Sequence, residues 1–300
     1  MGEKTRIEWA DHSWNGWIGC QKVGPGCDIC YAANLATIRL GVGWGPHAKR
    51  RRTADSTWRL PYRWDRRARA SGVPQSVFFG SLCDWADKAV PPDWQQDAGR
   101  VIQENPHLIW LLLTKRISLA SATLEIMFPG GVPPHVRIGS TIVTQKEADR
   151  DLPVLTALKR SLGLKGIFIS AEPLLEKLLI REMLDDIDWV IAGGETGKDP
   201  ETGLLSRLMP LDAIRGLRDQ CLETGTPFLM KQWGDWLPWG QTLANGSNNL
   251  VSKGKKPGQF HQEGGEIYVR LGKARTGRML DGVIWDQHPD WYAPFDRAAA

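Results

Sequence analysis

The feature that most constrains the fold is a series of six short hydrophobic runs separated by stretches of helical periodicity. The runs cover residues 76–84, 107–115, 136–144, 166–174, 188–196 and 227–234, and the clearest helical stretches are 94–105, 147–162 and 211–225. Strands that alternate with helices are typical of parallel βαβ units, and near-continuous hydrophobicity is typical of strands buried on both faces. The sequence therefore predicts an α/β fold with a parallel sheet.

A strand expected just before Cys20 brings the total to about seven βα units, which predicts a full or partial (β/α) TIM-type barrel. We expect this barrel to occupy residues 1–239. Within it, residues 42–75 are rich in Gly, Pro and Arg and show little periodicity, so they are predicted to form a basic insertion outside the core. Residues 240–300 are expected to form a small C-terminal β appendage, made of a polar loop and a β-hairpin over 266–289.

Each predicted strand of the six runs ends in polar or small residues. In chain order these are Ser81, Cys83 and Asp84; Thr114 and Lys115; Ser140 and Thr141; Ser170 and Glu172; Gly193, Gly194 and Glu195; and Lys231 and Gln232. Because the carboxyl ends of barrel strands meet on one face, these residues predict a polar pocket there.

Three of the five cysteines lie close together, at Cys20, Cys27 and Cys30, with the spacing C-x6-C-x2-C. An odd number of cysteines in a chain of this size does not indicate a disulfide framework, and a local cluster of thiols is more often metal-binding or catalytic. A closed zinc site would need a further protein ligand, for which His12 and His47 are candidates. A [4Fe–4S] cluster held by three cysteines leaves one iron open for another ligand. The spacing alone leaves both interpretations open.

Residues 49–69 carry nine Lys or Arg against two Asp, a local charge of +7 in a chain whose net charge is +4. Arginine pairs with phosphates, and the aromatic residues of the segment can stack on bases, so the segment predicts a nucleic-acid-binding surface. Its candidate residues are Lys49, Arg50, Arg51, Arg52, Arg59, Arg63, Arg66 and Arg67. The alternative is a solvated Arg-rich helix or loop.

The sequence has no apolar run of about 18 residues, the length that indicates a transmembrane helix. Its start, MGEKTRIEWADH, lacks the apolar core of a signal peptide. We therefore expect a cytoplasmic protein with no membrane partner.

The cysteine loop resembles the cluster loop of the radical S-adenosylmethionine (SAM) superfamily, in which three cysteines after the first barrel strand bind a [4Fe–4S] cluster. The usual spacing there is C-x3-C-x-aromatic-C, whereas here the first gap is six residues and Ile29 precedes the last cysteine. The whole chain resembles a family of radical-SAM-like proteins common in bacteriophages and mobile elements. The matching stretches are IEWADHSWNGWIGCQKVGPGCDICYA, LLLTKR, SAEPLL, VIAGGETG, PFLMKQWG and GRMLDG. A looser resemblance links it to spore photoproduct lyases, which are DNA-repair enzymes of the superfamily.

This resemblance implies a [4Fe–4S] cluster at Cys20, Cys27 and Cys30, with SAM chelating the fourth iron. Reductive cleavage of SAM would then give a 5′-deoxyadenosyl radical that abstracts hydrogen from the substrate. The electron would come from a donor such as flavodoxin or ferredoxin. The looser resemblance makes a nucleic acid the expected substrate, with DNA base modification or repair favoured.

The superfamily usually has Gly-Gly-Glu near the end of its second strand, in contact with the SAM amino group. This chain has GSLCD there, so Gly80 and Ser81 occupy the expected place of that contact. Ser140 and Thr141 are candidates for the ribose hydroxyls. The other candidate cofactor residues are Asp84, Glu172, Gly193, Gly194 and Glu195, of which the two glutamates are also suited to the substrate. For each of these, the alternative is a buried group satisfied by its neighbours.

Cys83 and Lys231 are the candidate catalytic residues. Cys83 lies where it could donate hydrogen or hold an adduct, although packing is the commoner role of a buried cysteine. Lys231 at a buried strand end needs an anionic partner, either the substrate or the SAM carboxylate. Two rival functions stay open: a zinc-bearing nucleic-acid-binding protein without catalysis, and a radical SAM enzyme that acts on a small metabolite or peptide.

Overall fold

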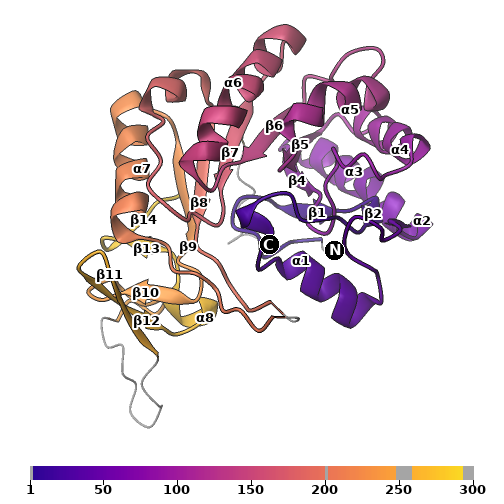
Figure 1. Cartoon of the computed structure of the whole chain (residues 1–300). Coiled ribbons are helices and arrows are strands. Elements are labelled where there is room, and N and C mark those ends of the chain that lie inside the picture. The colour runs from indigo at the N-terminus through magenta and orange to yellow at the C-terminus, as the bar shows by residue number, and fades with distance from the viewer. Residues whose placement is uncertain (1–2, 200–201, 248–258, 293–300) are drawn as a thin grey trace.

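The computed structural model describes residues 3–199, 202–247 and 259–292. Its centre is a seven-stranded sheet in the order β1-β4-β5-β6-β7-β8-β9 (Figure 1). The strands are β1 (His12–Trp14), β4 (Gln75–Phe79), β5 (Leu108–Thr114), β6 (Val136–Thr141), β7 (Ile167–Ala171), β8 (Trp189–Gly193) and β9 (Phe228–Gln232). Every neighbouring pair is parallel. The predicted parallel α/β fold is confirmed, and each of the six hydrophobic runs contains a strand.

The sheet curls without closing. Among the described residues, β1 and β9 are its two edges and do not pair with each other. The fold is therefore a half-barrel: the prediction of a partial TIM-type barrel is confirmed, and that of a full barrel is wrong.

Helices connect most successive strands and pack on the outer face of the sheet (Figure 1). They are α4 (Pro92–Gln103), α5 (Ala120–Met127), α6 (Gln145–Leu162) and α7 (Leu211–Thr224), whereas a short 3-10 helix, η4 (Arg181–Asp186), lies between β7 and β8. The start of α6 is capped because the side chain of Thr144 accepts a hydrogen bond from the backbone N–H of Glu147. The three predicted helical stretches correspond to α4, α6 and α7.

The connection from β1 to β4 is long and contains the cysteine loop. Its elements are β2 (Trp17–Ile18), η1 (Pro25–Cys27), α1 (Tyr31–Asn34), a π-helical turn η2 (Leu35–Arg39), β3 (Arg51–Arg52), α2 (Asp55–Trp58) and α3 (Leu60–Ser71). Residues 42–75, in which little regular structure was expected, thus contain a helix of 12 residues. Its apolar side consists of Pro61, Trp64 and Ala68, all of them buried, and the arginines between them hide this pattern in the sequence.

Side chains of the strands alternate between two cores, because successive residues of a strand point to opposite faces. Val77 and Phe79 point outward, to the core under the helices. Phe78 points to the concave face, where the ring of Trp9 packs on it with centroids 4.5 Å apart. The N-terminal segment therefore fills the concave face of the half-barrel.

The C-terminal part begins with an antiparallel sheet in the order β10-β12-β11. Its elements are β10 (Trp236–Pro238), β11 (Phe260–Glu263), β12 (Glu266–Arg270), α8 (Lys273–Thr276), β13 (Met279–Leu280) and β14 (Val283–Ile284). The hairpin predicted over 266–289 is confined to β13 and β14, because β12 pairs with β10 and β11 instead. Residues 248–258 and 293–300 of the predicted appendage lie outside the described residues, and the division of the chain at residue 239 stays a prediction. In the described ranges, no helix is long and apolar enough to span a membrane.

Candidate functional site

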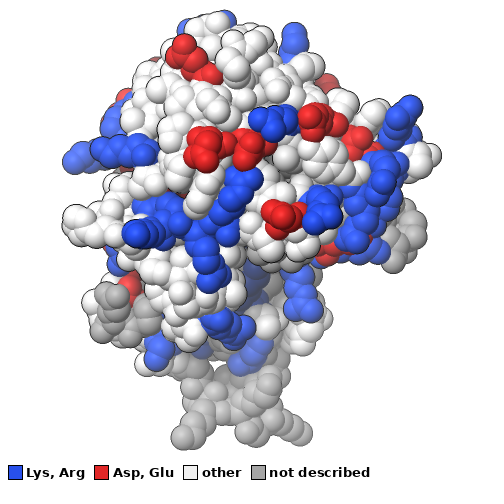
Figure 2. Space-filling view, turned by 90° about the vertical axis from the view of Figure 1, so that its right-hand side faces the viewer, with Lys and Arg blue, Asp and Glu red and all other residues white. Residues whose placement is uncertain are grey.

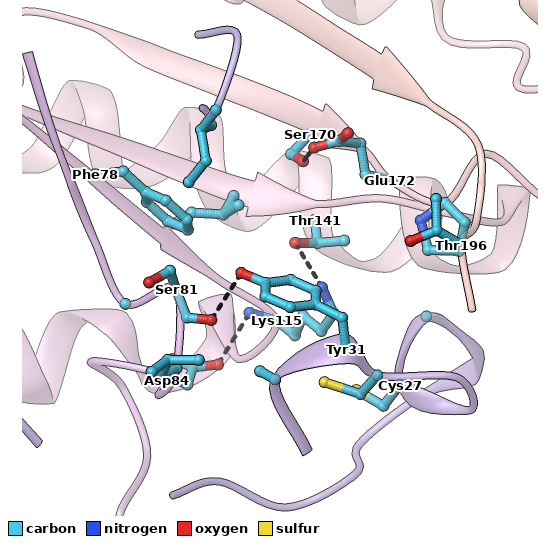
Figure 3. Close-up of a pocket in the computed structure, with 18 of the residues that line it drawn as sticks. Cys27, Tyr31, Phe78, Ser81, Asp84, Lys115, Thr141, Ser170, Glu172 and Thr196 are labelled. Atoms are coloured by element: carbon cyan, nitrogen blue, oxygen red, sulfur yellow. Dashed lines mark hydrogen bonds between the residues drawn. The ribbon is translucent and has the colours of Figure 1, made fainter. Parts of the chain in front are cut away.

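A cavity of about 570 Å³ lies at the carboxyl ends of the strands, and Cys20, Cys27 and Cys30 all line it (Figure 3). This volume is in the range of sites that bind small molecules and cofactors. The predicted strand-end residues that line it are Gly80, Ser81, Cys83, Asp84, Thr114, Lys115, Thr141, Ser170, Glu172, Gly194, Glu195, Lys231 and Gln232. The structure thus brings most of the predicted polar residues together around the cysteine loop.

Two predicted cofactor residues do not line the cavity. Ser140 has the same orientation along β6 as Ile138, which points into the outer core, so its hydroxyl faces away from the cavity. Gly193 is covered by Glu172, since a Cβ at this glycine would lie 2.7 Å from the Glu172 Oε1 atom. Gly193 therefore makes room for the side chain of Glu172.

The cysteine loop is held close to the start of α6. A Cβ at Gly24 would lie 2.8 Å from the Oε1 atom of Glu147, and one at Gly26 would lie 3.1 Å from the side chain of Val143. Glycine permits this close approach of the backbone. The tight packing sets the path of the loop, with Cys27 at the end of η1.

Arg116 holds the first part of the loop. Its guanidinium donates to the Cys20 Sγ atom over 3.4 Å and to the backbone carbonyl of Gln21 over 2.9 Å. The same group is paired with Asp84 at 2.7 Å, and both side chains are almost fully buried. Asp84, predicted as a SAM ligand, also accepts hydrogen bonds from Thr114 and from the Lys115 backbone, so it acts here as the counter-ion of Arg116.

Arg207 holds the second part of the loop. It donates to the backbone carbonyl of Pro25 over 2.8 Å and pairs with Asp28 at 3.0 Å. Its other contact is an ion pair of 2.5 Å with the buried carboxylate of Glu195, which follows β8. Glu195 is thereby committed to Arg207, and the two arginines fix both sides of the loop to the sheet.

Burial disfavours the thiolate form of two cysteines of the loop, Cys20 and Cys30. Burial raises the pKa of Cys20 to about 12, and the nearby charge of Asp84 acts in the same direction. Burial also raises the pKa of Cys30 and holds that of Cys83 well above its usual value. Because metals bind thiolates, metal uptake at this site would release protons.

The three thiols of the loop are free cysteines that line one cavity. In residues 3–199, 202–247 and 259–292, no three His, Cys, Asp or Glu side chains converge as ligands of one ion. His12, a proposed further zinc ligand, stacks on Trp64 with centroids 4.3 Å apart and bonds to Gln75 at 3.0 Å, so it belongs to the core. Three cysteines are the donor set that a [4Fe–4S] cluster with one open iron uses.

Two lysines carry positive charge into the cavity. Lys231 pairs with Glu172 at 3.0 Å, and Glu172 also accepts a hydrogen bond of 3.3 Å from the hydroxyl of Ser170. Lys115 lies between the cysteine loop and β6, where its ammonium donates to the Thr141 hydroxyl over 3.2 Å (Figure 3). Within the described residues, Lys115 has no carboxylate in ion-pair contact.

Ser81 and Cys83 follow β4, which lies toward the other end of the sheet from β9, the strand of Lys231. The hydroxyl of Tyr31 donates to the backbone carbonyl of Ser81 over 2.8 Å (Figure 3). The amide of Asn15 donates to the Ser81 hydroxyl over 2.8 Å, and its oxygen lies 3.6 Å from the Cys83 Sγ atom. Asn15 therefore fixes both residues at the edge of the cavity.

None of the eight predicted nucleic-acid-binding residues lines the cavity. Arg50 is not on the surface at all, because its side chain is 1% exposed and pairs with Asp87 at 2.8 Å. Arg52 stacks on Trp58, 3.8 Å from the ring centroid. The seven predicted residues other than Arg50 are at least partly exposed. Figure 2 shows groups of Lys and Arg on the side of the molecule where α2 and α3 lie. A basic surface is therefore present, without Arg50.

Residues 4–289 match the family described as "Protein of unknown function (DUF5131)". The chain belongs to the DUF5131 family. No curated protein matches the sequence. Among solved structures, the DUF5131 chain is similar to a spore photoproduct lyase mutant with bound AdoMet and dinucleoside spore photoproduct, at 12% identity and a TM-score of 0.44, over 87% of this chain and 68% of that one. It is also similar to spore photoproduct lyase complexed with dinucleoside spore photoproduct, at 12% identity and a TM-score of 0.46, over 89% and 70% of the two chains.

Two site residues of this DUF5131 chain, Asn15 and Arg207, were missed from the sequence. Asn15 directly follows β1, which was a usable signal, whereas Arg207 belongs to no strand end. Arg116 was expected to bind an anionic substrate or the SAM carboxylate, and in the structure it is paired with Asp84. The roles of Asn15 and Arg207 come from contacts between distant segments, such as that of Arg207 with Asp28.

Proposed function

We propose that the protein is a radical SAM enzyme whose [4Fe–4S] cluster is held by Cys20, Cys27 and Cys30 in the cavity. The observation that carries this proposal is that three free thiols share one cavity with the half-buried ammonium of Lys115. When bound, the cluster and SAM would supply the reductive cleavage that generates a 5′-deoxyadenosyl radical.

The residues beside the loop fit the polar groups of SAM. Lys115 is suited to a carboxylate, since it has only the Thr141 hydroxyl as a side-chain partner in the described structure. Thr141 and the fixed hydroxyl of Ser81 are suited to the ribose and to the amino group. Gly80 has a φ of 106°, a conformation that favours glycine. A Cβ at this position would lie 3.2 Å from the carbonyl oxygen of Cys83, so Gly80 shapes the turn beside Ser81. We assign these four residues to the cofactor.

The remaining wall of the cavity is suited to the substrate. Lys231 and Glu172 offer a donor and an acceptor side by side, and a group of the substrate can bind to either or exchange a proton with it. Gly194 lies so close to the backbone of Trp233 that a side chain there would clash, since its Cβ would meet the carbonyl oxygen at 1.9 Å. Cys83 has a protonated thiol at the cavity edge, which is the form that donates hydrogen.

We propose a nucleic acid as the substrate, with DNA favoured, and an electron donor such as flavodoxin or ferredoxin as the second partner. The exposed arginines of α3, including Arg63 and Arg67, support a phosphate-rich partner. The cavity of about 570 Å³ supports an enzyme over a protein that only binds nucleic acid.

The test is the formation of 5′-deoxyadenosine by anaerobically reconstituted protein with dithionite and SAM. We expect 5′-deoxyadenosine above the background of the same mixture without protein, and more of it when single-stranded or duplex DNA is added. Stoichiometric zinc with no SAM cleavage would favour the zinc-bearing binding protein. SAM cleavage that no nucleic acid changes would favour a small metabolite or a peptide as substrate.

A further inference from the structure

Two cations that line the cavity have no carboxylate partner in the described part of the chain. Its four carboxylates each pair with a cation: Glu8 with Lys273 at 3.5 Å, Asp84 with Arg116 at 2.7 Å, Glu172 with Lys231 at 3.0 Å and Glu195 with Arg207 at 2.5 Å. Two further cations line the same cavity, Lys115 and Arg6. Neither of these two forms an ion pair in the described part of the chain. Lys115 and Arg6 are therefore available to negatively charged groups of a ligand.

The two cations without an ion pair, Lys115 and Arg6, lie on different walls of the cavity. Lys115 belongs to the wall with the cysteine loop, because a Cβ at Gly26 would lie 3.6 Å from its Cε atom. Arg6 belongs to the N-terminal segment, which is anchored in the concave face by Trp9. One anionic cofactor group at Lys115 leaves Arg6 without a function in cofactor binding.

A second cation lies near Arg6. Lys273, at the start of α8, is exposed and contacts Glu8, which is two residues from Arg6 and hence at most about 7 Å away along the backbone. Arg6 is exposed as well. Two exposed cations from separate segments thus flank one edge of the cavity.

We propose that Arg6 and Lys273 form a phosphate-binding subsite at this edge, and that it holds a phosphodiester of a nucleic-acid strand whose nucleotide enters the cavity. This inference rests on the proposed function, because it names the part of the substrate that the same cavity recognises. An arginine guanidinium and a lysine ammonium are the groups that proteins most often use for phosphate oxygens.

The surface beyond this edge favours a strand over a free nucleotide. Glu3 lies three residues before Arg6, at most about 11 Å away along the backbone, and forms ion pairs with both Arg63 and Arg67 of α3. These two arginines remain 51% and 45% exposed. Basic residues therefore continue from the cavity edge onto α3, and a strand with several phosphates has basic partners at both places.

The test uses metal-free protein without SAM, so that it is independent of the cluster. Binding of a fluorescein-labelled single-stranded DNA oligonucleotide is followed by anisotropy between about 50 and 200 mM salt, with thymidine monophosphate as a separate ligand. The variants are Arg6→Gln, Lys273→Gln and the pair together. The matched control is Arg160→Gln in α6, an exposed arginine that is not among the cavity residues.

Each single variant is expected to weaken oligonucleotide binding about three- to tenfold at low salt, and to reduce the salt slope by about 0.7. The double variant combines both losses, and Arg160→Gln binds like the wild type. Changing Arg63 and Arg67 to Gln is expected to weaken oligonucleotide binding further and to leave the binding of thymidine monophosphate unchanged.

Three results would overturn the inference. They are wild-type protein that binds neither ligand, a double variant that binds the oligonucleotide like the control, and binding of the monophosphate alone. Iron content after reconstitution is measured on the same variants. Normal iron content with unchanged DNA binding in the double variant refutes this subsite and leaves the proposed function standing. Weakened DNA binding in a protein that takes up no iron supports the subsite and refutes the proposed function.

Discussion

Replacing Cys20, Cys27 and Cys30 together by alanine is expected to abolish iron binding. Anaerobically reconstituted wild-type protein should hold about four irons and four sulfides per chain, and the triple variant almost none. The physical reason is that these thiols are the free cysteines of one loop on one cavity wall, and no protein side chain replaces them there. Iron and sulfide analysis together with the visible absorbance of the cluster measures the effect.

The matched control for this variant is Cys221→Ala. Cys221 is also a free cysteine, but it is buried in α7 and does not line the cavity. We expect it to retain the full iron content. Equal iron in the triple variant and in the wild type would show that the cluster is not bound by this loop.

Replacing Arg116 by methionine is expected to destabilise the protein by about 3–5 kcal/mol, because it leaves the carboxylate of Asp84 buried without its counter-ion. The free energy of unfolding from urea titration measures this loss. The double variant Arg116→Met with Asp84→Asn should recover most of it, since no buried charge is then unpaired.

The same double variant separates stability from an effect on the cluster. Arg116 donates to the Sγ atom of Cys20, and hydrogen bonds to the sulfur ligands raise the reduction potential of a cluster. We therefore expect the double variant to bind a cluster whose midpoint potential is more negative than that of the wild type. A wild-type stability for Arg116→Met would contradict the buried ion pair, and an unchanged potential would contradict the contact with Cys20.

The sheet could be predicted from the sequence because its strands are buried on both faces. A run such as Leu108–Thr114 is apolar at almost every position, which only a covered parallel strand requires. The closure of the barrel could not be predicted, since an open edge and a paired edge have similar residues. Helix α3 was missed because its exposed arginines outnumber the apolar positions around Trp64.

The site could be predicted only in part. The cysteines and the strand ends are local signals, and most of those residues do line the cavity. Ser140 and Thr141 are neighbours in β6 and therefore point to opposite faces of the sheet. Which of the two faces the cavity depends on the register of β6, which could not be predicted from the sequence. Arg207 pairs with Asp28 across 179 residues, and Arg6 lies in the N-terminal segment away from any strand end, so their places at the site become visible only in the folded chain.

The most direct test of the central claim is the electron paramagnetic resonance spectrum of the reduced, reconstituted protein before and after SAM is added. We expect the signal of a reduced [4Fe–4S] cluster, and a clear change of that signal with SAM, because the iron without a cysteine ligand would bind it. The triple cysteine variant should show neither signal. A cluster signal that SAM leaves unchanged, or a protein that holds zinc and no cluster, would contradict the proposal.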